Sequence, residues 1–265
     1  MNLKRVSDTI CAALVAVTLA FAGAAQAGRP CEDTPLDAAT VTQSMALAEE
    51  VAARLSQTSA RVVVIARAGQ DLDRWGVRWS HMAFAYRDDS GAWRVVHELN
   101  HCATPNSALY RQGLGDFFLD HMYRYETAIV ALRPDVQEKL LPMLADDARI
   151  RQWHVDRYNM LAYPWALEYQ QSNQWVLETL AGAMLGEGAS RVEAQGWLKG
   201  NGYKPGLLRI DTLTRLGARL TRANVAFDDH PPEKRFAGRI ETVTVDSALA
   251  WLRACGMGSA PILVR

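Results

Sequence analysis

The sequence has no excess charge of either sign. Its 265 residues include 29 basic and 29 acidic side chains, so the formal net charge at pH 7 is zero. Lysine and arginine form no cluster, whereas a nucleic-acid partner requires a basic face for its phosphates. We therefore expect no nucleic acid among the partners of this protein.

Long hydrophobic runs are also missing, except at the N-terminus. A basic segment precedes the apolar run 10–23, and an A-x-A cleavage pattern that ends at Ala27 follows it. The run is shorter than the roughly 20 residues that span a bilayer. The sequence thus predicts a signal peptide over 1–27, cleaved after Ala27, and an exported, periplasmic protein with no transmembrane segment after cleavage.

Cysteine is scarce, and three of the four cysteines follow the predicted cleavage point: Cys31, Cys102 and Cys255. An exported protein meets an oxidising compartment, which favours one disulfide and leaves one free thiol. The sequence does not indicate which two cysteines pair.

Helix and strand patterns follow one another in mixed order along the mature chain. β-branched and aromatic residues favour four strands, over 60–68, 80–87, 92–99 and 126–133. Residues 172–186 have the clearest helical pattern, with Ser172 where an N-cap belongs. Neither a repeat nor a low-complexity tract is present. We expect a single α+β domain over 28–265.

Residues 97–101 spell HELNH, which matches the HExxH pattern of zinc proteases. His97 and His101 reach one zinc ion only from a helix, because residues four apart on a strand lie about 13 Å from each other. Trp93 and Val96 favour a strand instead, and no third ligand follows at the usual spacing. A zinc metallopeptidase is therefore an alternative that requires this stretch to be helical.

If the same stretch forms strands, it resembles the histidine hairpin of circularly permuted papain-like proteins. These are the permuted NlpC-type hydrolases, to which lecithin:retinol acyltransferase is related. In that group a Ser-His pair opens one strand, a polar residue follows on the next strand, and a cysteine begins a later helix. Ser80-His81, His97 and the helix that begins near Ser172 follow in this order.

That resemblance implies the fold. We expect an antiparallel sheet packed on helices, a permuted papain-like core, over about 60–185. A helical C-terminal extension would follow over about 186–265. Stretches such as "WRVVHELNHC" and "YQQSNQWVLETLAGAM" further resemble a family of exported bacterial proteins known only as a domain of unknown function, and this second resemblance implies no activity.

The papain-like resemblance also implies a site. Ser172 would replace the cysteine as nucleophile, favoured by the helix dipole, with His81 as general base and His97 as the group that orients it. His81 and His97 share a face if the hairpin loop is odd in length, while an even loop would offer Glu98 instead. Ser172 equally fits a simple helix cap. Three further polar residues would be binding neighbours of the site: Gln170, Asn173 and Gln174.

These observations predict an amide or ester hydrolase, or an acyltransferase, that acts on a cell-envelope substrate. No cofactor is expected for such a reaction. The first alternative is a non-catalytic envelope-binding module that kept the fold and lost the thiol. The second alternative is the zinc metallopeptidase.

Overall fold

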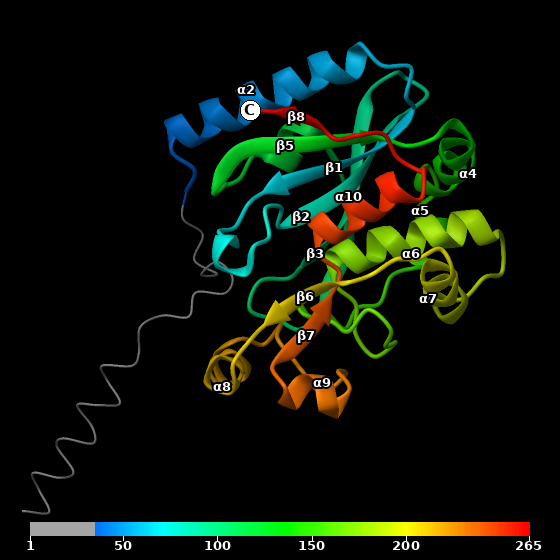
Figure 1. Cartoon of the computed structure of the whole chain (residues 1–265). Helices are drawn as coiled ribbons and strands as arrows, with labels where there is room; N and C mark the ends of the chain where they lie inside the picture. Colours follow the sequence, from blue (N-terminus) through cyan, green and yellow to red (C-terminus); the bar gives the residue numbers. More distant parts are fainter. Residues whose placement is uncertain (1–34) are drawn as a thin grey trace, which may run out of the picture.

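A six-stranded antiparallel sheet forms the centre of the protein in the computed structural model, which describes residues 35–265 (Figure 1). The strands are arranged in the order β4-β3-β2-β1-β5-β8. They are β1 (Val62–Ala68), β2 (His81–Arg87), β3 (Trp93–Asn100), β4 (Ser107–Gly113), β5 (Arg124–Ala131) and β8 (Ile262–Val264). The signal peptide predicted over 1–27 lies outside the described residues.

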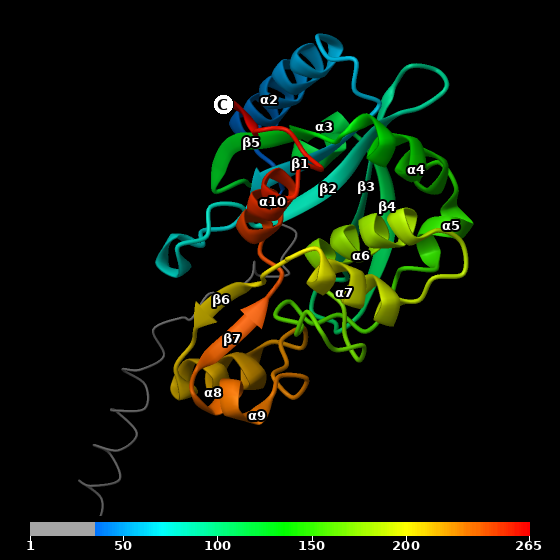
Figure 2. The ribbon, with the colours of Figure 1, turned by 45° about the vertical axis from the view of Figure 1, so that its right-hand side comes forward.

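Helices cover both faces of this sheet. Alternate side chains along its strands point to opposite sides, and apolar side chains occupy both sides. Phe84 and Val96 face one apolar layer, and Ala85 and Val95 face the other. The first layer contains α4 (Pro134–Leu144), α5 (Asp147–Arg151), α6 (Ser172–Leu185), α7 (Arg191–Gly200) and α10 (Val245–Ala254). The second contains α2 (Ala38–Ser56) and α3 (Leu114–Phe118) (Figure 2). The expectation of an α+β protein with an antiparallel sheet packed on helices is confirmed.

The C-terminal part contains more strands than the helical extension that the sequence predicted, in which one strand was expected near 240–245. Strand β8 returns to the edge of the main sheet beside β5. A small unit precedes it, in which β6 (Gly206–Arg209) pairs with β7 (Arg239–Thr242) and two short helices, α8 (Thr212–Thr221) and α9 (Pro232–Phe236), lie between them in the chain. Strands β6 and β8, with four and three residues, are too short to show a period of two, so the sequence pattern did not distinguish them.

None of the helices within residues 35–265 is long and apolar enough to cross a membrane. Cys102 is disulfide-bonded, whereas Cys255 is free. The pairing of Cys102 with Cys255, which the sequence left open, is therefore excluded. Cys31 lies outside the described residues.

Helix α6 is buried on nearly all sides, and one glycine makes this possible. Gly182 lies against the indole of Trp153, and a Cβ atom on Gly182 would lie 2.0 Å from the Trp153 Cζ2 atom. Two carbon atoms cannot approach so closely, and the indole is itself buried in the core. The helix–indole packing thus requires glycine at position 182.

We predict opposite effects for two glycine-to-alanine substitutions on neighbouring helices. Gly182→Ala should lower the free energy of unfolding by about 1–3 kcal/mol, because the new methyl group overpacks the core. A Cβ atom on Gly196, in α7, would have no atom within 4 Å. Gly196→Ala should therefore raise the free energy of unfolding by about 0.5–1 kcal/mol, because alanine favours helix. Urea denaturation followed by circular dichroism measures both values. Similar values for the two variants would contradict the packing described here.

Candidate active site

The hairpin of β2 and β3 places two histidines side by side. The loop between the strands is odd in length, and Phe84 opposes Val96 across the ladder. His81 and His97 therefore share a face of the sheet, and His81 Nε2 lies 2.9 Å from His97 Nδ1. Glu98 points to the opposite face, so the alternative in which it orients His81 is wrong.

A glutamine on β4 extends this contact into a chain of hydrogen bonds. Gln112 Oε1 lies 2.8 Å from His97 Nε2. An amide oxygen only accepts, so His97 Nε2 donates to it, and in a neutral ring His97 Nδ1 must then accept from His81 Nε2. The same rule leaves Nδ1 of His81 without a proton. This atom has a lone pair that can act as a base.

The surroundings of the pair keep both imidazoles neutral. The Phe117 ring of α3 lies 6.0 Å from the His81 ring and 5.4 Å from the His97 ring, centroid to centroid. Burial, followed by the charge of Arg67, lowers the pKa of His97 to about 4. Burial also lowers the pKa of His81 well below its usual value, with smaller contributions from His97 and Arg67. Neutral rings are what the hydrogen-bond chain requires.

HELNH belongs to a strand and not to a helix. Residues 97–100 are the last four residues of β3, and His101 follows them at an exposed position. The helical spacing that would direct His97 and His101 to one zinc ion is therefore absent, and His97 is engaged by His81 and Gln112. Within residues 35–265, no group of three or more His, Cys, Asp or Glu residues is placed to hold a metal ion.

Ser172 begins α6 but does not cap it. The N-cap is Gln171, whose Oε1 accepts a hydrogen bond from the Asn173 amide at 3.0 Å. The expected cap is thus one residue away, and the Ser172 hydroxyl is not needed to close the helix. The Tyr158 phenol lies near Ser172, and burial raises the pKa of Tyr158 to about 12. The phenol is therefore protonated at neutral pH.

Asn173 joins the first turn of α6 to the start of β2. Its Oδ1 accepts a hydrogen bond from the Met82 amide at 3.0 Å. Asn173 follows Ser172 in the chain and Met82 follows His81, so this hydrogen bond holds the two candidate residues near each other. Ser172 and His81 line the same cavity. Among residues 35–265, no hydrogen bond joins the Ser172 hydroxyl to His81.

The cavity has a volume of about 800 Å³ and is lined by residues of the main sheet, the first turn of α6 and the small unit around β6 and β7. His81, Ser172 and Asn173 contribute polar groups to it. Much of the remaining wall is apolar and includes Trp75, Trp79, Met160, Leu161, Leu208 and Phe227. Such a cavity suits a ligand that joins a reactive polar group to an apolar portion.

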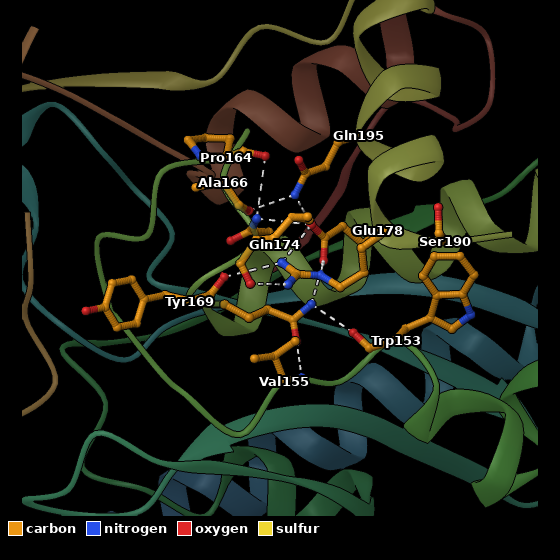
Figure 3. Close-up of polar contacts among 12 residues, drawn as sticks. Trp153, Val155, Pro164, Ala166, Tyr169, Gln174, Glu178, Ser190 and Gln195 are labelled. Atoms are coloured by element: carbon orange, nitrogen blue, oxygen red, sulfur yellow. Dashed lines mark hydrogen bonds and ion pairs between the residues drawn. The ribbon is translucent and has the colours of Figure 1, made fainter. Parts of the chain in front are cut away.

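Two of the expected binding residues belong to a buried cluster around Glu178 instead (Figure 3). Arg191 holds the Glu178 carboxylate with two contacts, Nε to Oε2 at 2.7 Å and Nη2 to Oε1 at 3.0 Å. Amide Nε2 atoms of Gln170, Gln174 and Gln195 reach the same carboxylate at 2.5, 3.1 and 2.8 Å. Gln170 and Gln174 therefore hold Glu178 and do not line the cavity.

The cluster also fixes the segment that leads into α6. Arg191 donates to the carbonyl oxygens of Leu167 at 3.0 Å and Tyr169 at 3.3 Å. Gln170 donates to the carbonyl oxygen of Trp153 at 2.8 Å. The direction in which the chain enters the helix, and with it the place of Ser172, thus depends on this cluster.

We predict that Arg191→Met lowers the free energy of unfolding by about 3–5 kcal/mol, because it leaves the buried Glu178 carboxylate without its cation. Arg149→Met is the matched control, since Arg149 pairs with Glu187 at the surface, at 2.9 Å. It should cost less than about 1 kcal/mol. Chemical denaturation of both variants tests this, and a small loss in the Arg191 variant would show that the ion pair is dispensable.

Glu98 is a second buried carboxyl group, and unlike Glu178 it forms no ion pair within residues 35–265. Within the described part of the chain, neither of its oxygens has a hydrogen-bond partner. Burial raises the pKa of Glu98 to about 8, an effect that nearby Ser107 moderates and the charge of Glu178 reinforces. The Ser107 hydroxyl is itself directed to His154 Nε2 at 3.0 Å. Glu98 is therefore largely protonated at neutral pH.

The raised pKa of Glu98 predicts a pH-dependent stability. Between the ordinary glutamate pKa and about 8, the unfolded chain loses the Glu98 proton while the folded chain keeps it, so stability falls as the pH rises. Glu98→Gln should remove this fall. Its advantage over the original protein should grow from about pH 5 to about pH 8 by at most about 1.4 kcal/mol per pH unit. Urea denaturation across this range measures it, with the surface variant Glu187→Gln as control. A constant difference would contradict a protonated Glu98.

The fold and the cavity define an α+β protein with a buried histidine pair near the start of a buried helix. More specifically, residues 54–252 match a family described as an uncharacterized protein conserved in bacteria (DUF2145). The match spans most of the 265 residues, and the chain belongs to this family. No curated protein and no solved structure matches the chain.

Sequence reasoning missed Gln112 and Tyr158. Gln112 lies on β4, a strand whose sequence, "SALYRQG", has no marked alternation. Only its pairing with β3, in which Val95 opposes Gln112, brings the amide to the face of His97. Tyr158 stands in a loop rich in aromatic residues, and no spacing signal distinguished it from residues of the core.

Proposed function

We propose that the protein is a papain-like amide or ester hydrolase, or an acyltransferase, with Ser172 as nucleophile. The main support is the hydrogen-bond chain from Gln112 through His97 to His81, which leaves an unprotonated Nδ1 on a histidine that shares a cavity with Ser172. A nucleophilic serine needs such a base, and the base needs an oriented imidazole.

In the proposed reaction, His81 Nδ1 takes the proton of the Ser172 hydroxyl as Ser172 Oγ attacks the carbonyl carbon of the substrate. The resulting imidazolium returns this proton to the leaving amine or alcohol, and the acyl group remains on Ser172. Water, or the hydroxyl of an acceptor, then releases the acyl group by the same proton transfers in reverse. His97 and Gln112 hold the His81 ring and determine which nitrogen is free.

Tyr158 is the proposed oxyanion donor. Its phenol lies near Ser172, where a tetrahedral intermediate would form. A pKa of about 12 keeps the phenol a donor at neutral pH, and tyrosine hydroxyls serve this purpose in other enzymes. The amino-terminal end of α6 adds a favourable dipole for the negative charge.

The proposed substrate joins an amide or ester group to an apolar portion and belongs to the cell envelope. Its apolar portion is inferred from Trp75, Trp79 and the other apolar side chains of the cavity wall. Its place in the envelope is inferred from the signal peptide that the sequence predicts. The permuted papain-like relationship is part of the same proposal, supported by the order of the histidine hairpin and the later helix.

A non-catalytic binding module is the second candidate. The observation in its favour is that no hydrogen bond joins the Ser172 hydroxyl to His81 among residues 35–265. A serine is also harder to deprotonate than the cysteine that the papain-like resemblance expects. The cavity would then bind the same kind of envelope molecule without turnover.

A cysteine introduced at the site distinguishes the two candidates without knowledge of the substrate. In a Cys255→Ser background, Ser172→Cys should react with iodoacetamide at about pH 6 at least roughly tenfold faster than an ordinary thiol, because a nearby base and the helix dipole favour the thiolate. Adding His81→Gln should abolish this acceleration. Mass spectrometry gives the rates, and free Cys255 in the original protein is the reference. If the introduced thiol reacts no faster than that reference, the binding module is supported.

Activity on model esters gives a second test of the same proposal. We expect slow hydrolysis of p-nitrophenyl octanoate that Ser172→Ala abolishes and Tyr158→Phe reduces by about 10–100-fold, close to the range in which loss of one oxyanion donor falls. A fluorophosphonate probe should label Ser172 and no other residue. Hydrolysis that persists in the alanine variant would assign the nucleophile elsewhere.

A further inference from the structure

Helix α8 exposes a row of leucines. Leu213, Leu216 and Leu220 are 80%, 55% and 77% exposed, although large apolar side chains are usually covered. At about 100° per residue, their spacing places all three on one side of the helix. The neighbouring helix α9 adds Phe236, which is 73% exposed. Both helices lie at the end of the molecule opposite α2 (Figure 1).

The other side of α8 forms part of the cavity wall. Thr214, Ala218 and Thr221 line the cavity that also contains His81 and Ser172. By the same helical spacing, these three side chains point away from the leucine row. Helix α8 thus separates the cavity from the exterior and presents leucines outward.

Positive charge borders the leucine row. The segment Thr212–Thr221 has two arginines and no acidic residue. Arg215 is buried and donates to the Ile210 carbonyl oxygen, whereas Arg219 is exposed. Two more exposed arginines oppose each other in the paired strands, Arg209 at the end of β6 and Arg239 at the start of β7. A short helix with a leucine face and an arginine border matches the chemistry of an anionic lipid surface.

We propose that α8 docks on an anionic lipid surface, with Leu213, Leu216 and Leu220 at the boundary between headgroups and acyl chains. Arg219, Arg209 and Arg239 would lie at the level of the negatively charged headgroups. Docking in this orientation places one wall of the cavity at the lipid surface. The proposal does not depend on Ser172 being a nucleophile, because a binding module would use the same surface.

The test is co-sedimentation of the chain from residue 28 onward, which contains every described element, with vesicles of phosphatidylcholine alone or mixed with phosphatidylglycerol. We expect binding to the mixed vesicles that weakens as the salt concentration rises. The triple variant Leu213→Ser, Leu216→Ser, Leu220→Ser should bind at least roughly tenfold more weakly. Arg219→Gln should lower binding about fivefold at low salt, the share of one cation near a lipid surface, and should have no effect at high salt.

The matched control replaces three exposed apolar residues elsewhere, Leu167, Leu185 and Val192, by serine, and it should bind as the original protein does. Thermal unfolding verifies that both triple variants are folded. If the α8 variant melts early, the single variant Leu213→Ser, at the most exposed position of the row, replaces it, with an expected loss of about threefold. Absence of binding to the anionic vesicles, or equal losses in α8 and control variants, would overturn the proposal. So would a dimer that the α8 substitutions convert to a monomer, since the leucines would then join two copies of the chain.

Discussion

The site depends on the buried ion pair between Glu178 and Arg191. A carboxylate inside a helix that is buried on nearly all sides is tolerated only when a cation and further donors satisfy it, because its desolvation is costly. Arg191 and three glutamines meet this requirement, and Arg191 also holds two carbonyl oxygens of the segment that enters α6, those of Leu167 and Tyr169. The place of Ser172 is therefore determined by a residue further along its own helix. The cluster binds no ligand in the proposed reaction, yet it positions the residue to which we assign the chemistry.

The β2–β3 hairpin and the first turn of α6 each contribute one candidate catalytic residue to the cavity. The hairpin supplies His81, with its ring direction determined by His97 and Gln112, and α6 supplies Ser172 at its first residue. The bond from the Met82 amide to the Asn173 side chain connects the two. Helix α8 lies between this polar site and the exterior, with one side in the cavity wall and the leucine row on its outer side. A substrate with an apolar portion, drawn from a lipid surface, would account for both features together.

A large part of the fold was predictable from the sequence, and the reason is local. The strands near 62–68, 81–87 and 93–100 have β-branched and aromatic runs bounded by turn residues, and α6 has an apolar pattern with a glycine at its end. Strands β4, β6 and β8 were missed, because short or weakly patterned segments become strands only through their partners. Gln170 and Gln174 were expected at the site for a similar reason: a polar residue at the start of a helix gives no sign that it faces a buried carboxylate.

The sequence by itself determined the element types of the core, the order of histidine hairpin and later helix, and the candidates His81, His97 and Ser172. These follow from patterns within a few residues, where propensity and side-chain alternation decide the structure. Only the tertiary structure decided the rest. The register of the hairpin separated His97 from Glu98, and the pairing of β3 with β4 brought in Gln112. Each of these outcomes depends on contacts between segments distant in the sequence, whose relative positions no local pattern specifies.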